Sequence, residues 1–161
     1  MIRPVLPADA DAVAALIRLA FQSIPVPLDP PPSALRETGD SLRAHLATGG
    51  GAMVDGPAGC VLWSEHNGGL YLGRLCVHPA QQGRGLAALL VGAAEAEARR
   101  RGLPRLHLGV RLALAGNRRL FTRLGFTETR LHTHDGCEGP TWIEAERWLT
   151  APPTGTGIPP G

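Results

Sequence analysis

The sequence has few aromatic residues, few cysteines and no long apolar run. Aromatic side chains make up 4% of the 161 residues, so leucine, valine and alanine must fill most of the interior. The three cysteines, Cys60, Cys76 and Cys137, form no C-x-x-C pair, and an odd count argues against a disulfide framework and favours a reducing cytoplasm. The N-terminus lacks the long apolar segment of a signal peptide, and no apolar run approaches the length of a membrane span.

Charge of either sign is also modest. Charged residues are 19% and apolar residues 43%, which is ordinary for a globular protein. The net charge of +2 is too small to indicate a nucleic-acid partner. The one cluster of arginines, 99–101, falls late in a helical pattern, where cations complement the helix dipole. The composition therefore predicts one soluble domain with a substantial core and without a nucleic-acid or membrane role.

Hydrophobic periodicity and turn residues predict strands and helices in a mixed order. In the first half we expect a strand at 2–6, a helix at 10–21, a Pro-rich connection at 25–32, a helix from an N-cap at Ser33 to 46 broken by glycines 49–51, and strands at 52–55, 60–65 and 70–77. Asn67-Gly68 predicts a hairpin between the last two strands. In the second half we expect a helix at 85–101 with a buried stripe of Leu86, Leu89, Leu90, Ala93 and Ala94, then a strand at 105–110, a helix at 117–124, and strands at 126–133 and 142–148.

This order predicts an α/β fold in which a central mixed sheet carries helices on both faces. The unit from 70 to 110 is a strand, a helix and a strand, which predicts a parallel crossover. We place one domain at residues 1–149. The tail at 150–161 is rich in proline and glycine, and we expect it to be disordered.

The most informative segment joins the strand that ends at Val77 to the helix that follows. It reads Leu75-Cys76-Val77-His78-Pro79-Ala80-Gln81-Gln82-Gly83-Arg84-Gly85-Leu86-Ala87-Ala88. Two glycines let the backbone approach a ligand closely, and the free N–H groups of a helix start attract anions. The guanidinium group of Arg84 is available to form an ion pair with such an anion. The segment predicts a phosphate or carboxylate site.

Of two nucleotide-binding interpretations of this segment, one is weak and the other is excluded. Gly83-Arg84-Gly85-Leu86-Ala87-Ala88 matches the dinucleotide fingerprint G-x-G-x-x-G/A formally. However, the strand ends well before Gly83, the next strand has no acidic residue for a ribose, and the chain is short for a doubly wound domain. A P-loop is excluded because no G-K-[ST] follows. A nicotinamide-dependent enzyme is therefore the weaker alternative.

A resemblance to a known family fits better. The run from Gln82 to Ala87 resembles the Q/R-x-x-G-x-G/A signature of the GNAT acyltransferases, and it follows a strand ending in V-x-P as in that family. The run from Asn117 to Phe126 resembles the family's N-x-x-L-Y-x-x-x-G-F segment. The resemblance covers roughly residues 2–149.

The resemblance implies a sheet that is splayed to admit acetyl-CoA, and an N-acetyltransferase activity on a primary amine, either a small molecule or a peptide N-terminus, by direct attack. It implies that Leu75, Cys76 and Val77 contact the pantetheine arm. Backbone amides from Gln82 through Ala88 (Gln82, Gly83, Arg84, Gly85, Leu86, Ala87, Ala88) would hold the diphosphate. Asn117 and Phe121 would also contact the co-substrate, and the Val77 amide would polarise the thioester carbonyl. A homodimer is a further possibility within the family.

Two positions depart from the family pattern. Phe121 replaces the Tyr that is thought to protonate the leaving thiolate, and phenylalanine cannot donate a proton. Tyr71, the only tyrosine, stands where some members carry a Glu that acts as general base. Two interpretations of Tyr71 stay open, because it is either a half-buried strand residue or a group that orients the amine or a water. His78 is read as incidental. These departures keep open the alternative of a non-catalytic acyl-CoA-binding module.

A metal interpretation of the C-terminal loop is also weighed. His132, His134 and Cys137 carry ligand atoms, and Asp135 or Glu138 would supply a fourth. A polar loop beside the acceptor pocket explains the same residues, so we predict no metal. Contact of His134, Asp135 or Glu138 with the acceptor amine stays a hypothesis.

Overall fold

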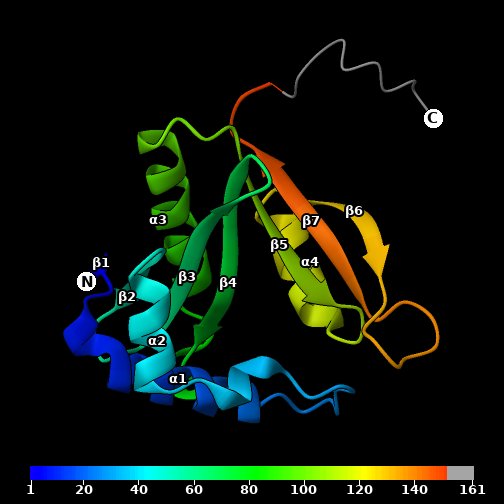
Figure 1. Cartoon of the computed structure of the whole chain (residues 1–161), viewed down its shortest axis with the longest axis horizontal. Coiled ribbons are helices and arrows are strands. Elements are labelled where there is room, and N and C mark those ends of the chain that lie inside the picture. The colour runs from blue at the N-terminus through cyan, green and yellow to red at the C-terminus, as the bar shows by residue number, and fades with distance from the viewer. Residues whose placement is uncertain (152–161) are drawn as a thin grey trace.

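The computed structural model describes residues 1–151 and shows a seven-stranded sheet with helices on both faces (Figure 1). The order of elements agrees with the order expected from the sequence. The strands are β1 (Ile2–Pro4), β2 (Gly50–Val54), β3 (Gly59–His66), β4 (Gly69–Val77), β5 (Arg105–Arg111), β6 (Thr127–His132) and β7 (Trp142–Trp148). The helices are α1 (Ala10–Gln22), α2 (Gly39–Leu46), α3 (Leu86–Arg100) and α4 (Ala115–Arg123). The tail expected to be disordered lies, from residue 152, outside the described residues.

The strands lie in the order β1-β2-β3-β4-β5-β7-β6, and the central pair is the parallel one. β4 and β5 pair only through Leu70 with Leu106 and Tyr71 with His107. From residue 72 to Val77, β4 has no partner in β5, although both strands continue. The sheet is therefore splayed at its centre, as the family resemblance implies.

A bulge in β4 lies beside this splay. Cys60 of β3 pairs with Cys76, but Leu62 pairs with Gly73, so β4 holds one extra residue in between. Arg74 lies within the bulge and has a left-handed φ of 55°. A bulge bends its strand and increases its twist, and bulges of this kind are common beside active sites.

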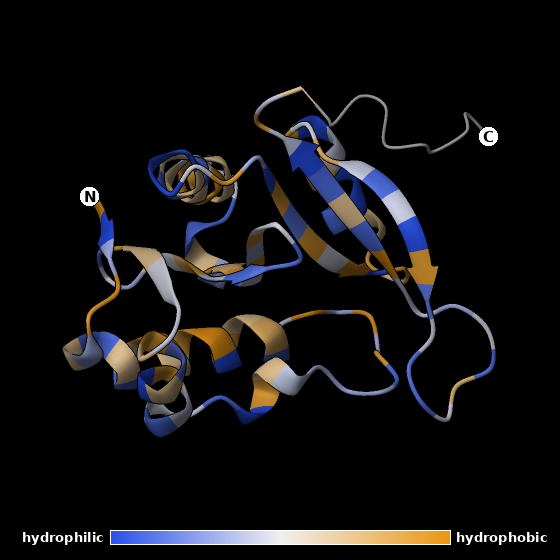
Figure 2. Ribbon diagram, turned by 45° about the horizontal axis from the view of Figure 1, so that its top comes forward, coloured by the Kyte–Doolittle hydropathy of each residue, from blue (hydrophilic) through white to orange (hydrophobic). Residues whose placement is uncertain are grey.

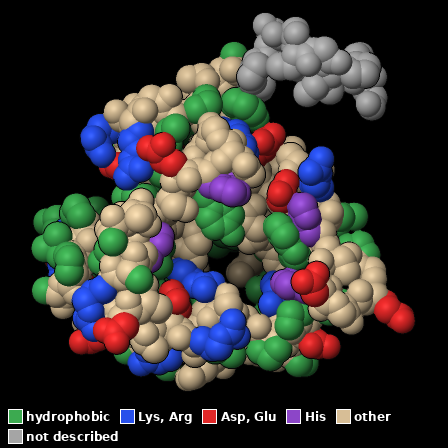
Figure 3. Space-filling view, viewed as in Figure 1, with side chains coloured by type: hydrophobic (Ala, Val, Ile, Leu, Met, Phe, Trp, Pro, Cys, Tyr) green, Lys and Arg blue, Asp and Glu red, His purple; other side chains and the backbone are tan. Residues whose placement is uncertain are grey.

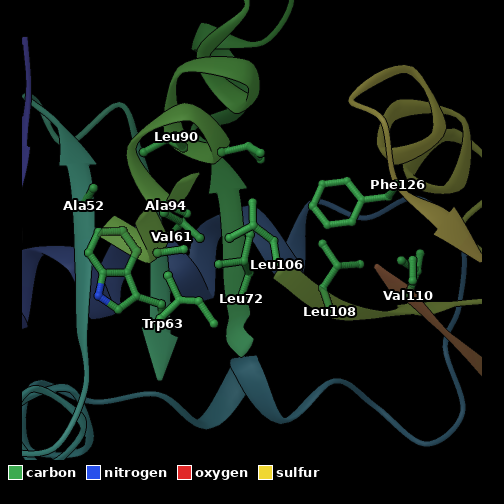
Figure 4. Close-up of a cluster of buried hydrophobic side chains, with 14 of the residues drawn as sticks. Ala52, Val61, Trp63, Leu72, Leu90, Ala94, Leu106, Leu108, Val110 and Phe126 are labelled. Carbon is green, nitrogen blue, oxygen red and sulfur yellow. The ribbon is translucent and has the colours of Figure 1, made fainter. Parts of the chain in front are cut away.

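Both faces of the β2–β4 half of the sheet are buried. Along β3, Val61 and Trp63 face one core, whereas Cys60 and Leu62 face the other, because successive side chains alternate across a strand. Figure 2 shows α3 on one side of the sheet and the layer of α1 and α2 on the other. Figure 4 shows the larger core, which lies between the sheet and α3. This two-sided burial explains why β3 reads as a continuous apolar run.

The buried stripe of α3 differs from the predicted one. Leu90 and Ala94 are buried as expected, but Leu89 is 54% exposed. Val91 and Ala98 complete the buried face instead. Leucines at 86, 89 and 90 fit two overlapping helical stripes, and packing selects the one centred on Leu90, Ala94 and Ala98. The pairs Glu95–Arg99 and Glu97–Arg101 form as predicted.

One further prediction in the first half was wrong. Ser33 does not cap α2, because it begins a separate 3₁₀ turn, Ser33–Arg36. Thr38 is the cap, and its hydroxyl accepts a hydrogen bond from Ser41 N at 3.1 Å. α2 ends at Leu46, before the glycines at 49–51, as predicted, and Gly50 and Gly51 begin β2. A Cβ on Gly51 would lie 2.5 Å from the Val61 carbonyl oxygen, so this glycine permits close strand packing.

Candidate active site

A cleft of about 520 Å³ opens where β4 leaves β5. Its walls come from four parts of the chain: the end of α1, the second half of β4, the turn into α3, and α4. The lining residues are Ala20, Phe21, Ile24, Leu75, Cys76, Val77, Gln81, Gln82, Gly83, Gly85, Leu86, Ala87, Ala88, Asn117, Leu120, Phe121 and Arg123. Arg123 is the one charged residue among them, so the lining has no carboxylate and carries net positive charge.

The turn at Gly83 and Gly85 lines one end of the cleft. Gly83 has φ 82° and Gly85 has φ 74°, a region that glycine enters without cost. No atom lies within 4 Å of a Cβ built on either residue, so backbone conformation rather than space requires glycine here. α3 begins at Leu86, and its first N–H groups have no partner inside the helix. These donors and the helix dipole favour a phosphate at this end of the cleft.

The structure brings together nearly all the residues predicted to hold the co-substrate. All of them line the cleft except Arg84, whose side chain is exposed in the turn between the two glycines. His78 has a structural role instead, because its Nδ1 accepts a hydrogen bond from Ala80 N at 3.0 Å and caps the turn that follows β4. Sequence reasoning missed Ala20, Phe21 and Ile24, since nothing local to α1 indicates that its end meets β4.

Phe121 lies in the wall of the cleft and is half-buried. Its ring meets that of Phe126 edge to face, with ring centroids 5.7 Å apart. Phe126 belongs to the core and is 4% exposed. The contact with Phe126 thus holds the ring of Phe121 in a defined position, but the residue itself supplies no proton.

Tyr71 lies at the point where the splay begins, among histidine rings. Its ring centroid is 5.3 Å from that of His107 and 6.3 Å from that of His66. Burial raises the pKa of Tyr71; the positive charge of Arg74 lowers it by less, and the negative charge of Glu144 adds a smaller raising effect. The phenol therefore stays protonated at neutral pH and acts only as a hydrogen-bonding group.

His107 is the titratable group that the sequence did not single out. Burial lowers its pKa below the ordinary 6.5, against a raising effect from the His66 carbonyl, whose oxygen lies 2.7 Å from Nε2. The neutral ring must carry its proton on Nε2 to donate to that carbonyl, which leaves a lone pair on Nδ1. His107 is therefore neutral and basic at pH 7. The signal missed in the sequence was its pairing with Tyr71, which depends on the register between two distant strands.

Two loops flank the end of β5 on the face that α1 and α2 leave open. Burial lowers the pKa of Arg111, and the proximity of Asp29 and Cys137 opposes this effect. Asp29 belongs to the Pro-rich connection and Cys137 to the loop between β6 and β7, so both loops approach Arg111. Figure 3 shows a hollow in this face, bordered by basic, acidic and histidine side chains.

The C-terminal loop is held by contacts within the protein. The ring of His132 stacks on Trp142 with centroids 4.0 Å apart, and its Nε2 lies 3.0 Å from Glu144 Oε1. The backbone N of His134 donates to Thr141 Oγ1 at 2.9 Å. Within residues 1–151, no three His, Cys, Asp or Glu side chains are grouped to hold a metal ion.

The family assignment follows from the sequence of this region. The pattern of the Acetyltransferase (GNAT) family matches residues 13–126, which include β4, the glycine turn, α3 and α4. The chain belongs to this family and is an acyltransferase that uses acetyl-CoA as co-substrate. No curated protein is similar enough in sequence to count as a match. None of the helices in residues 1–151 has the length and apolar character needed to cross a membrane.

Solved structures share the fold across almost the whole chain. The structure of yncA from Salmonella typhimurium, solved with its cofactor acetyl-CoA, has 22% sequence identity and a TM-score of 0.68, over 96% of this chain and 98% of that one. The paia N-acetyltransferase from Thermoplasma acidophilum, in complex with coenzyme A, has 17% identity and a TM-score of 0.72, over 92% and 98%. The ribosomal-protein-S18-alanine N-acetyltransferase from Escherichia coli has 18% identity and a TM-score of 0.69, over 96% and 97%.

Proposed function

We propose that this protein transfers the acetyl group of acetyl-CoA to a primary amine, either on a small molecule or at a peptide N-terminus. The observation that carries the proposal is the cleft between β4 and α4, which ends at the glycine turn before α3. The family match and the carboxylate-free lining of the cleft support acetyl-CoA as the donor. The two loops around Arg111 support an amine acceptor that enters from the opposite side of the sheet.

The co-substrate would lie along the free edge of β4. Residues 75–77 have no strand partner in β5, so their backbone groups are available to the pantetheine arm. The amides of residues 82–88 would hold the diphosphate, with Arg84 beside it. Asn117 and Phe121, on α4, would contact the pantetheine arm from the facing wall of the cleft. The thioester then reaches the splay, where the acceptor arrives.

The reaction we propose is a direct attack. The amine lone pair adds to the thioester carbonyl carbon, the C–N bond forms, the C–S bond breaks, and CoA leaves as its thiolate. The Val77 amide would stabilise the negative charge that develops on the carbonyl oxygen. Phe121 donates no proton, but a thiolate is a tolerable leaving group near neutral pH, since thiol pKa values are modest.

The proton lost by the amine needs an acceptor, and Tyr71 with His107 would supply one. Neutral His107 has a free lone pair on Nδ1, and the Tyr71 hydroxyl both donates and accepts hydrogen bonds. Together they would position a water or the amine itself at the start of the splay. Tyr71 is the candidate that the sequence pointed to, and the 5.3 Å separation of its ring from that of His107 supports the proposal that His107 is the base.

A second candidate function is a non-catalytic acyl-CoA-binding module. Phe121 and Tyr71 favour it, because each replaces a group that other family members use for proton transfer. Binding without turnover would distinguish this alternative.

The acetyltransferase proposal is tested by thiol release from acetyl-CoA with a panel of amines and peptides. The chain contains no lysine, so acetyl-lysine found after the reaction belongs to the acceptor rather than to the protein itself. Release of CoA that depends on an added primary amine supports the proposal. Tight acetyl-CoA binding without release for any amine would instead favour the binding module.

Localisation and oligomeric state stay predictions. All three thiols are free, which is consistent with a cytoplasmic protein, and the homodimer is untested.

A further inference from the structure

One face of α4 carries three arginines that the proposed reaction does not use. Ala115, Arg118, Arg119, Thr122 and Arg123 recur at spacings of three and four, so they share one side of the helix. Together with Glu128 they line a second, shallower hollow of about 490 Å³. Asn117 and Phe121, on a different side of α4, face the co-substrate cleft instead.

Only one of these arginines is neutralised. Arg118 forms a two-pronged ion pair with Glu128, with Nε to Oε2 at 2.8 Å and Nη2 to Oε1 at 2.9 Å. Arg119 and Arg123 have no carboxylate within ion-pair distance among residues 1–151. The hollow therefore carries the net charge of two exposed guanidinium groups, with the Arg118–Glu128 pair as a fixed neutral wall.

This basic hollow adjoins the co-substrate cleft. Arg123 lines both of them, so its side chain stands at their common border. The backbone donors of residues 83–88 suit the diphosphate of acetyl-CoA, and they are already committed to it. CoA carries one more phosphate, a monoester on the 3′ carbon of its ribose. A phosphate monoester holds between one and two negative charges at neutral pH, and paired guanidinium groups match its oxygens in charge and geometry.

We propose that Arg119 and Arg123 bind the 3′-phosphate of the co-substrate, so that this face of α4 selects CoA thioesters over thioesters lacking that phosphate. The inference rests on acetyl-CoA as the co-substrate and is independent of the acceptor. A nucleic-acid partner fits the same charges less well. The basic face spans one helix, Ala115–Arg123, and the chain as a whole carries a net charge of only +2.

The test compares two donors by calorimetric titration of the full chain: acetyl-CoA and acetyl-dephospho-CoA, which lacks only the 3′-phosphate. We expect the parent to bind acetyl-CoA about tenfold more tightly, as one charge-assisted contact predicts. In the Arg119→Gln/Arg123→Gln double variant, the two donors should bind equally, at the affinity of the parent for acetyl-dephospho-CoA. Both residues are exposed, so the melting temperature should not change.

Arg130→Gln is the matched control. Arg130 is an exposed arginine on β6 that forms no ion pair within the described chain and lines neither hollow. Its loss should leave the preference for acetyl-CoA intact. Added salt should narrow the preference in the parent, because exposed charges are screened within about 10 Å at 0.1 M salt.

Four outcomes would overturn the inference. Equal binding of both donors by the parent would show that the 3′-phosphate stays in solvent. A preference that survives in the double variant would assign the phosphate to another group, with Arg84 the first to examine. Weaker binding of acetyl-dephospho-CoA by the folded double variant would show that the arginines act on a part common to both donors. Binding of neither donor by the folded parent would overturn the acetyl-CoA assignment as well, which separates the two failures.

Discussion

Tyr71 on β4 and His107 on β5 form the last pair before the two strands separate, and their rings meet edge to face at 5.3 Å. The same register that ends the parallel pairing therefore places the only phenol of the chain against a neutral imidazole. His107 is fixed by the carbonyl of His66, and the His66 ring stacks on it at 6.0 Å. These contacts within the protein position the His107 ring at the splay, so its orientation does not depend on the co-substrate.

The pH dependence of turnover tests this arrangement. Burial lowers the pKa of His107, so the ring becomes protonated only at a pH below 6.5. If His107 is the base, activity falls as the pH drops through that lowered pKa and is constant just above it. We expect His107→Gln to remove this acid limb and to lower kcat by about a hundredfold, the lower range for general-base catalysis.

Tyr71→Phe supplies the matched comparison on the same acceptor. We expect a smaller loss of kcat, and a double variant that is hardly worse than His107→Gln alone, because the two groups act on one water or amine. Ionisation of the acceptor amine adds a second limb to the pH profile, and this limb is the same for all variants. An acid limb that persists in His107→Gln would assign the base to another group.

Ala88 offers a clean test of the anion site, because it lines the cleft within the first turn of α3 and its side chain is exposed. Ala88→Glu places a negative charge beside the phosphates, and we expect acetyl-CoA binding to weaken by at least about tenfold. Glutamate near a helix N-terminus favours the helix, so the variant should stay folded. Ala88→Gln is the neutral control of equal size. Calorimetric binding that is weakened equally by both would indicate a steric cause.

Local features of this site could be predicted because they depend on short-range chemistry. The left-handed conformations of Gly83 and Gly85 follow from residue type and from the helix start behind them. The hairpin at Asn67-Gly68 forms for the same reason, with φ of 48° and 73°. Local signals of this kind are sufficient to locate the cleft along the chain, although they do not specify the segments that form its walls.

Features that depend on packing between distant segments could not be predicted. The end of α1 reaches the cleft through Phe21 and Ile24, and Tyr71 meets His107 through strand register. The spacing of Leu89 fits a helical stripe and predicts a core position, but Leu89 is exposed, because packing alone decides between neighbouring stripes. In each case the sequence gives residue types, and tertiary contacts select which of them meet.

Phe121→Tyr tests whether proton donation to the leaving thiolate limits turnover. The ring is held against Phe126 at the wall of the cleft, so a hydroxyl added there projects from a fixed position. We expect kcat to rise by about two- to tenfold, less than full general-acid catalysis because a thiolate leaves readily. Phe126→Tyr is the control: it buries a hydroxyl in the core, and we expect lower stability with no gain in kcat. A fall in kcat for Phe121→Tyr would show that the ring only packs against the arm.

Asp9 should make stability depend on pH at the acid end. Two hydrogen bonds from Arg3 at 2.8 Å and one from Leu6 N lower the pKa of its carboxyl from 3.8 to about 2. A lowered pKa in the folded state contributes stability above pH 3.8 that is lost as the pH falls towards about 2. Asp9→Asn should therefore melt at a lower temperature than the parent near neutral pH, and the difference should shrink over that acid interval. A difference that is independent of pH would attribute the effect to the lost packing of the turn instead.

Gly51 and Gly92 should respond to alanine with opposite signs, although both lie within regular structure. A Cβ on Gly51 would lie 2.5 Å from the Val61 carbonyl oxygen and 2.9 Å from Leu62 Cδ2, so β2 and β3 must move apart. We expect Gly51→Ala to destabilise the fold by about 1–3 kcal/mol. Gly92 lies on the exposed side of α3 with no atom within 4 Å of its added Cβ, so Gly92→Ala should stabilise by about 1 kcal/mol through helix propensity. Urea unfolding with equal m-values measures both changes, and a neutral Gly51→Ala would mean that this glycine is present for chain flexibility rather than for strand packing.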